Sequence, residues 1–224
     1  MSLHILPDLE QGSPEWHDAR RGLVTASVVG RLVTHKTLKV ADNDESRNLT
    51  ALLVAERITQ HTDPTYVNDD MMRGVMAEPL ARDLYSQKYA PAIEVGFLLR
   101  EEATWKLGFS PDGLVGETGL LEIKSPRAKT HIRTVLSGEV PLYHIPQIQA
   151  GLLVSGRDWC DFLSYSPGLP MWRKRVEPDQ RWFDAIIEAV EQFESTAEHM
   201  IAQYQAAVVG LPETERLLDL EIVI

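Results

Sequence analysis

Residues 110–124 read SPDGLVGETGLLEIK and place two carboxylates and one lysine in the setting of a hairpin. Two glycines between the halves favour a turn, and the apolar run after them predicts a short strand that ends near Lys124. Because side chains alternate along a strand, Glu122 and Lys124 project to the same face. A hairpin here would bring the carboxylate of Asp112 close to that of Glu122.

Two carboxylates that converge beside one ammonium suit a hard cation. Mg²⁺ prefers oxygen ligands and often needs only one or two protein carboxylates together with water and substrate phosphate. Mn²⁺ accepts the same ligands and is expected to substitute. Such an ion would make hydroxide available near neutral pH, while Lys124 could orient or deprotonate the water or stabilise the transition state. The stretch predicts phosphodiester hydrolysis, although a surface hairpin with an exposed ion pair fits these residues alone as well.

The composition is that of a globular chain of one domain. With 224 residues, 44% hydrophobic and 25% charged, the chain can bury a substantial core, and we expect residues 1–224 to form a single nuclease domain. The sequence shows no membrane-spanning apolar run and no signal-peptide pattern. The single cysteine, Cys160, excludes a disulfide framework and a cysteine-cluster metal site. We therefore expect a soluble protein without a membrane partner, in a reducing cytoplasm.

The net charge of −11 is unevenly distributed. Residues 177–224 contain 11 acidic and 2 basic side chains, whereas residues 1–176 contain 22 acidic and 20 basic ones. The acidity is concentrated toward the C-terminus, and the remainder is free to form basic patches. The global charge therefore does not exclude a polyanionic partner such as DNA.

A second cluster of polar residues lies near the N-terminus. Residues 13–20 (SPEWHDAR) carry a helix start with Ser13 as N-cap, and a second helix is expected to begin near Thr25. Arg20, Arg21, Thr25 and Ser27 gather at this junction, where helix amides suit an anion. The alternative is an ordinary pair of helices with solvated arginines.

The remaining pattern predicts helices that alternate with short strands. Pro79 interrupts a helical stretch over 69–89, so we expect a kink or a restart there, with Glu78 at the break. The residues after Pro126 read as a helix whose basic side chains, His131 among them, suit DNA phosphates. Further predictions are a flexible loop over 36–48, a helix over 46–60, strands over 92–99, 104–109, 158–165 and 171–176, a helix over 144–156, a long helix from Pro178 whose apolar stripe serves core or subunit packing, and a strand-like apolar hexapeptide at the C-terminus.

Taken in order, these motifs resemble those of the phage lambda-type exonucleases, within the restriction-endonuclease-like nuclease superfamily. The shared residues are Trp16, His17, Arg20, Gly22, Thr25, Ala26 and Ser27 of a W-H-x-x-R-x-G-x-x-T-A-S element, Glu78 after Gly74, S-P-D-G at 110–113, E-x-K at 122–124, and the Q-x-Q pair Gln147 and Gln149. Each motif is weak alone, but five in this order cover most of the chain. Pro79, directly after Glu78, departs from the pattern.

The resemblance implies an α/β fold with a restriction-endonuclease-like core, in which a mixed β-sheet is flanked by α-helices and followed by a long C-terminal helix. It implies a Mg²⁺-dependent exonuclease that digests one strand of linear double-stranded DNA from 5′-phosphorylated ends. Relatives form a ring-shaped homotrimer and work with a single-strand annealing protein in recombination. Carried over by position, Glu78, Asp112, Glu122 and the Ile123 carbonyl would bind the metal, Lys124 would act on the water, and Arg20, Ser27, Ser110 and Gln147 would hold the 5′-phosphate.

Three other functions compete with this interpretation. A restriction- or repair-type endonuclease would share the metal site and cut internally. A DNA-end-binding protein that has lost catalysis would keep the fold, but the complete set of Asp112, Glu122 and Lys124 argues against it. A two-carboxylate glycosidase would not explain Lys124, and the aromatic-rich groove it needs is not evident in the sequence.

Overall fold

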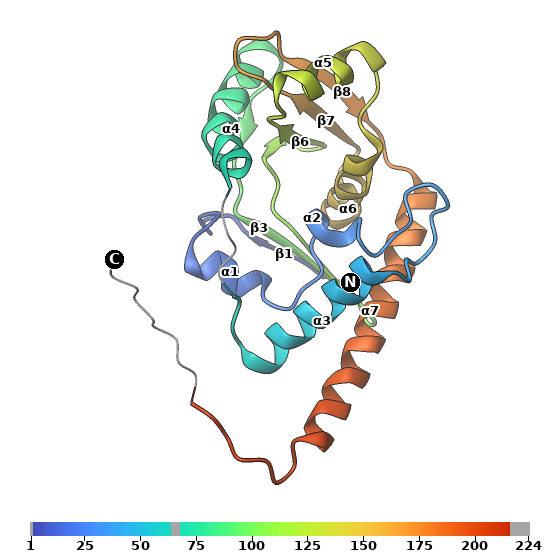
Figure 1. The fold of residues 1–224 in the computed structure, drawn as a ribbon. Helices are drawn as coiled ribbons and strands as arrows, with labels where there is room; N and C mark the ends of the chain where they lie inside the picture. Colours follow the sequence, from blue (N-terminus) through green and yellow to red (C-terminus); the bar gives the residue numbers. More distant parts are fainter. Residues whose placement is uncertain (1, 64–67, 216–224) are drawn as a thin grey trace.

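The hairpin predicted from residues 110–124 forms the middle of the larger of two sheets (Figure 1). The computed structural model describes residues 2–63 and 68–215. In it, β5 (Gly113–Val115) pairs antiparallel with β6 (Gly119–Lys124), and Gly113 lies opposite Leu121. Gly116 turns the chain between the two strands with a φ of 54°, a conformation that favours glycine.

The larger sheet is mixed and the smaller one is antiparallel. The larger sheet has the order β2-β5-β6-β7-β8, in which β6 runs parallel to β7 and the other neighbours are antiparallel. The smaller sheet has the order β1-β3-β4. The remaining strands are β1 (Ser2–Leu6), β2 (Ala92–Ile93), β3 (Phe97–Glu101), β4 (Lys106–Phe109), β7 (Trp159–Ser164) and β8 (Trp172–Val176). The predicted α/β class with a mixed sheet is confirmed.

Helices cover both faces of the larger sheet (Figure 1). On one face, Tyr85 of α4 (Asp69–Lys88) packs in a cluster with Leu121 and Leu163. On the other face, α6 (Ile145–Ser155) and α7 (Gln180–Ala207) share the main core with Leu120 and Phe162. The other helices are α1 (Pro14–Arg20), α2 (Ala26–Val29), α3 (Asp44–Thr59), α5 (Ala128–Ser137) and the short 3₁₀ helix η1 (Leu142–His144).

The long final helix uses its apolar stripe inside the chain. Trp182, Ile186, Val190 and Phe193 of α7 are buried in the core beside α3 and α6. The stripe is therefore core packing, while the end of α7 extends below the body of the molecule in Figure 1. The predicted C-terminal hexapeptide lies outside the described residues. Among the described helices, none is long and apolar enough to cross a membrane.

Two helices, α4 and α3, differ from the prediction. α4 continues through Pro79 as one helix, so the predicted restart is wrong. The ring of Pro79 is exposed, and the burial of Ala77, Ala81 and Tyr85 on the opposite side offsets the cost of about 3 kcal/mol of an interior proline. The loop predicted over 36–48 ends earlier, because Asn43 caps α3 in a capping box with Ser46.

The strand prediction over 92–99 and the basic role of His131 are also wrong. The first segment contains two strands, β2 and the start of β3, which belong to different sheets. β3 pairs there with β1, an exposed strand that the sequence pattern did not indicate. His131 is buried rather than facing DNA: its Nδ1 lies 2.8 Å from Ser164 Oγ and its Nε2 lies 3.0 Å from Pro170 O.

A buried aspartate ties α4 to the edge of the larger sheet. Asp161 of β7 is 0% exposed and accepts hydrogen bonds from Tyr85 Oη (2.7 Å), Arg175 Nε (2.9 Å) and Arg173 Nη1 (3.0 Å). Burial alone would raise the pKa of Asp161, but the bonds from Arg175 and Tyr85 outweigh it and hold the pKa below its usual value. The stabilisation is therefore present above the ordinary aspartate pKa of about 4 and is lost as the pH falls through the depressed folded value.

We predict that Asp161→Ala lowers the free energy of unfolding by about 2–3 kcal/mol, because it leaves two arginines and a buried hydroxyl without their partner. Urea denaturation at neutral pH measures this change. The control is Asp158→Ala, an exposed aspartate in the turn before β7, which should change the free energy by less than about 0.5 kcal/mol. Similar losses in both variants would contradict the role of Asp161.

Candidate active site

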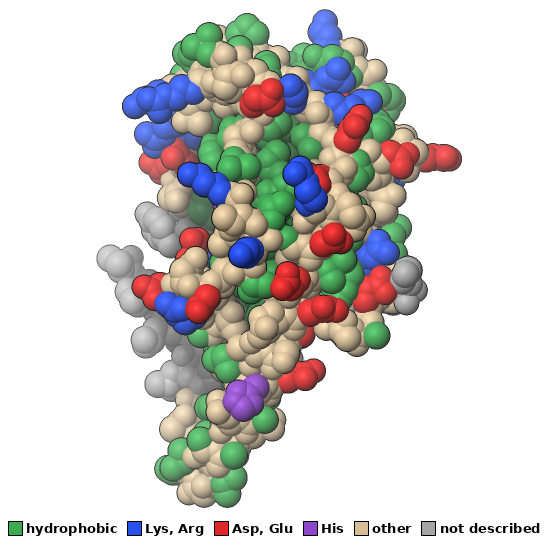
Figure 2. All heavy atoms as spheres, turned by 90° about the vertical axis from the view of Figure 1, so that its right-hand side faces the viewer, with side chains coloured by type: hydrophobic (Ala, Val, Ile, Leu, Met, Phe, Trp, Pro, Cys, Tyr) green, Lys and Arg blue, Asp and Glu red, His purple; other side chains and the backbone are tan. Residues whose placement is uncertain are grey.

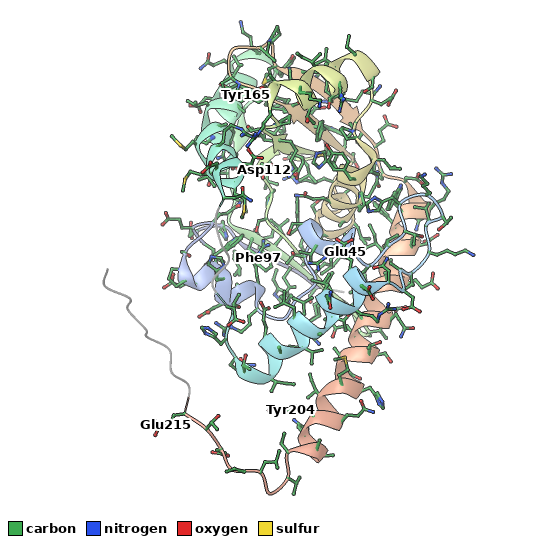
Figure 3. All side chains as sticks on the ribbon, viewed as in Figure 1. Glu45, Phe97, Asp112, Tyr165, Tyr204 and Glu215 are labelled. Carbon is green, nitrogen blue, oxygen red and sulfur yellow. The ribbon has the colours of Figure 1, made fainter. Side chains whose placement is uncertain are left out.

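The hairpin brings the predicted carboxylates and lysine together. The Oδ2 of Asp112, just before β5, accepts a hydrogen bond of 2.5 Å from the backbone N–H of Ile123. On β6, Lys124 Nζ lies 2.5 Å from Glu122 Oε1. This contact confirms that Glu122 and Lys124 share one face of the strand. Figure 3 labels Asp112 where the hairpin passes between α4 and α6.

Glu122 is the most unusual group of the site, because its carboxylate is buried and poorly satisfied. The residue is 1% exposed, and neither of its oxygens accepts a well-aligned hydrogen bond among the described residues. The ammonium of Lys124 is the contact that Oε1 makes. A buried charge is costly unless it is paired or coordinates a metal, so this arrangement points to a cation as the missing partner.

Glu78, on α4, is linked to the hairpin by Arg82, which lies one helical turn further along α4. Arg82 Nη2 donates to Glu78 Oε1 at 3.1 Å, and Arg82 Nη1 donates to the backbone oxygen of Asp112 at 2.9 Å. The same guanidinium lies 2.9 Å from Glu94 Oε2. Arg82 therefore holds α4 to the start of β5. No sequence motif singled out Arg82, although its position four residues after Glu78 is a helical pair spacing.

Burial and nearby carboxylates raise the pKa of all three carboxyl groups. Burial raises the pKa of Glu78 to about 7, with a further contribution from Asp112. Burial also raises the pKa of Glu122 to about 7 against the opposing charge of Lys124, and burial raises that of Asp112. Burial would lower the pKa of Lys124, but the carboxylates of Glu122 and Asp112 outweigh it and raise this pKa. Lys124 is therefore an ammonium at neutral pH.

The residues fit a Mg²⁺ ion without forming a ready-made cage. Among residues 2–63 and 68–215, no group of three or more His, Cys, Asp or Glu side chains stands in the arrangement of a metal site. In the structure these carboxylates instead face Lys124, Arg82 and the Ile123 amide. Mg²⁺ keeps several waters and needs only one or two carboxylates. The carboxylate oxygens of Asp112 and Glu122 meet that need, and Glu78 lies beside them. Both oxygens of Glu122 are buried and lack a hydrogen-bond partner among the described residues.

A second polar cluster adjoins the carboxylates through Ser110. The hydroxyl of Ser110 accepts hydrogen bonds of 2.9 Å from both Arg20 Nη1 and Trp16 Nε1. Arg20 Nη2 also donates to Ser27 Oγ at 3.4 Å, and Ser27 Oγ lies 3.0 Å from Thr25 Oγ1. Three predicted phosphate-binding residues are thus in direct contact.

The guanidinium of Arg20 is held rigidly. It stacks on the Trp16 ring, with Cζ 3.9 Å from the ring centroid. Burial lowers the pKa of Arg20 to about 10 against the opposing charge of Glu56, so the group stays cationic at neutral pH. Trp16 belonged to the recognised motif without an assigned role. Its stacking on Arg20 and its bond to Ser110 now supply one.

The two glutamines of the Q-x-Q pair have different environments. Gln149 is buried and joins α6 to the start of α7: its Nε2 donates to Glu177 O, and its Oε1 accepts from Asp179 N, both at 2.9 Å. Gln147 is half-buried at the start of α6. This end of α6 lies against α2, where a Cβ on Gly30 would come within 3.3 Å of Pro146. The structure brings the start of α6 to α2 but shows no bond between Gln147 and the Arg20 cluster.

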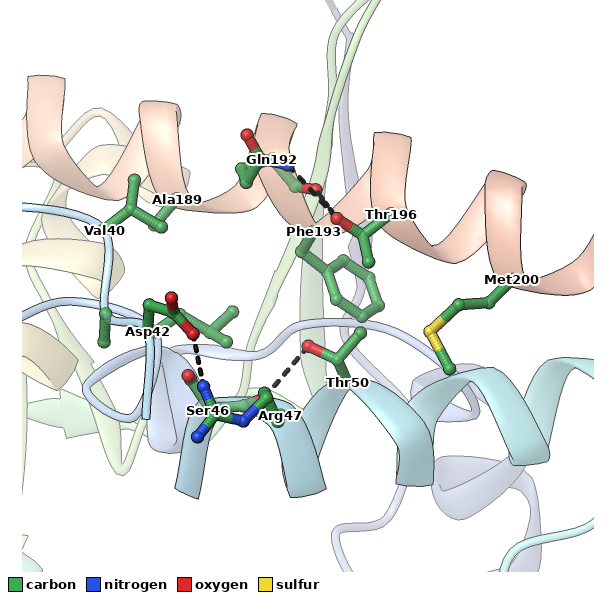
Figure 4. Close-up of a pocket in the computed structure, with 12 residues that line it drawn as sticks. Val40, Asp42, Ser46, Arg47, Thr50, Ala189, Gln192, Phe193, Thr196 and Met200 are labelled. Carbon is green, nitrogen blue, oxygen red and sulfur yellow. Dashed lines mark hydrogen bonds and ion pairs between the residues drawn. The ribbon is translucent and has the colours of Figure 1, made fainter. Parts of the chain in front are cut away.

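Two clefts in the structure differ in their relation to these residues. The larger, of about 620 Å³, lies between α3 and α7 and is lined by Arg47, Phe193 and Met200 among others (Figure 4). It contains none of the predicted site residues. A smaller cleft of about 380 Å³ includes both Ser27 and Tyr143 in its lining. Of these two clefts, the smaller one adjoins the candidate site through Ser27.

Comparison with known proteins assigns the family. Residues 15–158, more than half of the chain, match the YqaJ-like viral recombinase domain. The chain belongs to this family. The predicted resemblance to the lambda-type exonucleases is thereby confirmed, since viral recombinase domains and exonucleases are what the chain matches.

Three solved structures of exonucleases have folds similar to that of this chain. An alkaline exonuclease, LHK-Exo from Laribacter hongkongensis, is 34% identical over 89% of this chain and 100% of that chain, with a TM-score of 0.79. Its complex with dAMP gives 35% identity, the same coverage and a TM-score of 0.78. A phage-related exonuclease from Haemophilus somnus shares the fold at 12% identity over 81% of this chain and 96% of that one, with a TM-score of 0.61. No curated protein sequence matches the chain.

The raised pKa values predict how the stability of this YqaJ-like domain changes with pH. Glu78 and Glu122 titrate near 7 when folded but near 4.3 when unfolded, so folding binds protons and stability falls as the pH rises. Between about pH 6 and about pH 8, each such group costs ~1.4 kcal/mol. We expect the metal-free protein to be less stable at the higher pH, and Mg²⁺ to restore stability there by binding the ionised form.

Thermal unfolding in EDTA and in Mg²⁺ at the two pH values measures this. Glu122→Gln removes one titrating group and should reduce both the pH dependence and the stabilisation by Mg²⁺. Glu117→Gln, an exposed residue of the same hairpin, is the matched control and should behave like wild type. A metal-free protein whose stability rises between about pH 6 and pH 8 would contradict the assigned pKa shifts.

Proposed function

We propose that the chain is a Mg²⁺-dependent exonuclease that degrades one strand of linear double-stranded DNA in the 5′-to-3′ direction from 5′-phosphorylated ends. The observation that carries this proposal is the link through the segment 110–112. Ser110 accepts bonds from Arg20 and Trp16, and Asp112, two residues later, belongs to the carboxylate group. A terminal phosphate bound at Arg20 would therefore lie at a fixed distance from the reacting bond. The similarity to LHK-Exo, an alkaline exonuclease that is 34% identical to this chain, supports the same activity.

The Arg20 cluster has the chemistry that a terminal phosphate requires. A phosphate monoester carries roughly −1.5 to −2 charges and three acceptor oxygens. Arg20 supplies a positioned guanidinium, and the hydroxyls of Ser27 and Ser110 supply donors beside it. Gln147, at the start of α6, would approach the same phosphate from the α2 side. LHK-Exo was crystallised with a nucleoside monophosphate, dAMP, which contains such a group.

The residues of the hairpin divide the remaining tasks. Mg²⁺ would be held by Asp112 and Glu122, together with the Ile123 carbonyl and Glu78. When bound, the ion would polarise the phosphoryl group as a Lewis acid and lower the pKa of a bound water. Lys124 is an ammonium in the structure, which favours orienting the water or stabilising the developing negative charge over removing a proton. Arg82 positions Glu78 relative to Asp112 and does not touch the substrate.

The endonuclease alternative shares the metal site but gives the Arg20 cluster no purpose. An enzyme that cuts internally meets phosphodiesters, which carry one charge, and has no need of a separate site for a terminal monoester. The half-buried guanidinium of Arg20, stacked on Trp16 and bonded to Ser110, suits the higher charge of a terminal monoester. The exonuclease is therefore the function that the geometry favours.

The setting of the reaction is part of the same proposal. By analogy with the family, the enzyme acts in the cytoplasm as a homotrimeric ring and passes the 3′ strand to a single-strand annealing protein. Figure 2 shows basic side chains more frequent in the upper half of one face and acidic ones in the lower half. A closed ring would explain how a chain of net charge −11 stays on DNA.

Light scattering at micromolar concentration should give the mass of three chains, and the mass of one chain would contradict the ring.

Lys124→Ala should lower kcat by roughly 10²–10³-fold and change DNA affinity much less, because the ammonium acts on the charge that develops during the reaction. Single-turnover kinetics and equilibrium binding to a short duplex separate the two effects. Lys106→Ala, a surface lysine paired with Glu101, is the matched control and should retain activity. A loss that appeared mainly as weaker binding would show that Lys124 is a phosphate contact.

The polarity of degradation tests the phosphate site. Linear duplex with 5′-phosphate ends should be degraded at least about tenfold faster than the same duplex with 5′-hydroxyl ends, since charge-assisted bonds to the terminal phosphate are lost in the second. Arg20→Ala should erase most of that difference and leave slow hydrolysis. The neighbouring Arg21→Ala, whose guanidinium pairs with Asp18, should preserve it. Equal rates on both ends in wild type, or rapid cutting of closed circular DNA, would overturn the proposal.

A further inference from the structure

One exposed tyrosine shares a cleft with Ser27, a member of the Arg20 cluster. Tyr143, in η1, is 57% exposed, yet it lines the same cleft as Ser27. We infer that the ring of Tyr143 stacks on the base of the 5′-terminal nucleotide while Ser27 and Arg20 hold its phosphate. This inference rests on the proposed exonuclease function and deepens it by assigning the site of the base.

The backbone on both sides of Tyr143 is fixed. The N–H of His144 donates to Pro141 O at 2.9 Å, and the N–H of Ile145 donates to Leu142 O. η1 then continues directly into α6, which begins at Ile145. The tyrosine is therefore presented by a short, hydrogen-bonded turn at the start of a helix. A stacking platform benefits from this rigidity, because little conformational entropy is lost when the base binds.

His144 connects this platform to the carboxylates. Its ring centroid lies 4.2 Å from that of Tyr143 and 5.3 Å from that of Phe162. Phe162 in turn lies opposite Glu122 in the pairing of β7 with β6. Burial, aided by the charge of Lys124, lowers the pKa of His144 to about 3, so its ring is uncharged at neutral pH. A neutral aromatic ring thus backs Tyr143 on the side of the hairpin.

The lining of the cleft combines a group suited to phosphate with a group suited to a base. Ser27, which bonds to Arg20 and Thr25, is a polar lining residue, and the exposed Tyr143 is an aromatic one. Stacking on an aromatic ring tolerates every base, because each base has a π-face. An exonuclease that removes successive nucleotides needs such tolerance. A hydrogen-bonding base pocket would restrict it to particular sequences.

The other exposed tyrosines in the described part of the chain, Tyr89 and Tyr204, lack these properties. Tyr89 contacts Arg173, whose Cζ lies 4.3 Å from the ring centroid. Tyr204 lies near the end of α7, far from Asp112 in Figure 3. It is 48% exposed, similar to Tyr143, and therefore serves as a matched control for the loss of a surface tyrosine.

The test uses 5′-phosphorylated duplexes that carry either a normal nucleotide or an abasic analogue at the 5′ terminus. Wild type should degrade the normal end roughly tenfold more efficiently, because base–aromatic stacking is lost at the abasic end. Tyr143→Ala should bring the two rates together, Tyr143→Phe should keep them apart, and Tyr204→Ala should match wild type. Discrimination that persists in Tyr143→Ala would overturn the inference.

A second measurement does not require hydrolysis. With Ca²⁺ in place of Mg²⁺, wild type should quench the fluorescence of 2-aminopurine at the 5′ terminus, and Tyr143→Ala should lose most of this quenching. If the chain degrades DNA but quenching is the same in both proteins, the base contact is wrong and the exonuclease function stands. If quenching depends on Tyr143 but no DNA is degraded with Mg²⁺ or Mn²⁺, the exonuclease function fails and the base contact stands.

Discussion

The burial of the Glu122 carboxylate is the constraint on which the site depends. β6 is the central strand of the larger sheet, and the same alternation that sends Leu121 and Ile123 into the cluster under α4 sends Glu122 into the opposite core. A carboxylate in that place raises the free energy of the folded chain unless a cation compensates it. Lys124 supplies part of that compensation two residues along the strand, and Asp112 adds a further negative charge from the paired segment. The folded chain therefore holds two carboxylates beside one ammonium, and a divalent cation would compensate the remaining negative charge.

The same hairpin connects the buried carboxylates to the Arg20 cluster. Its first residues include Ser110, which accepts from Trp16 and Arg20 of α1, while its second strand ends at Lys124. Arg82 fastens α4 to the start of β5, and the start of α6 lies against α2. Elements that lie far apart in the sequence thus converge on one short segment of backbone. Because both the Arg20 cluster and the carboxylates contact that segment, a shift of the segment would move them together and keep the distance between them constant.

The sequence predicted those features that depend on local alternation and on the order of motifs. The hairpin, the shared face of Glu122 and Lys124, the contact of Arg20 with Ser27 and Ser110, and the mixed sheet all follow from such patterns. Features that depend on tertiary packing were missed. Pro79 did not break α4, because the buried face of the helix outweighs one lost hydrogen bond, and β1 is exposed along its length and so carries no burial signal. His131 and Gln149 looked functional but satisfy buried polar groups, a distinction that requires the partner atoms.

Direct binding of metal tests the central claim, that the buried carboxylates of the hairpin form a cation site. Isothermal titration calorimetry of the protein with Mn²⁺ measures that binding without any DNA. The titration is run at about pH 8, where both Glu78 and Glu122 are ionised. The structure predicts that wild type and Arg20→Ala bind with the same affinity, and that Asp112→Asn and Glu122→Gln bind at least about tenfold more weakly. Unchanged affinity in folded Glu122→Gln would contradict the claim, because the group whose burial demands a cation would then have no part in holding it.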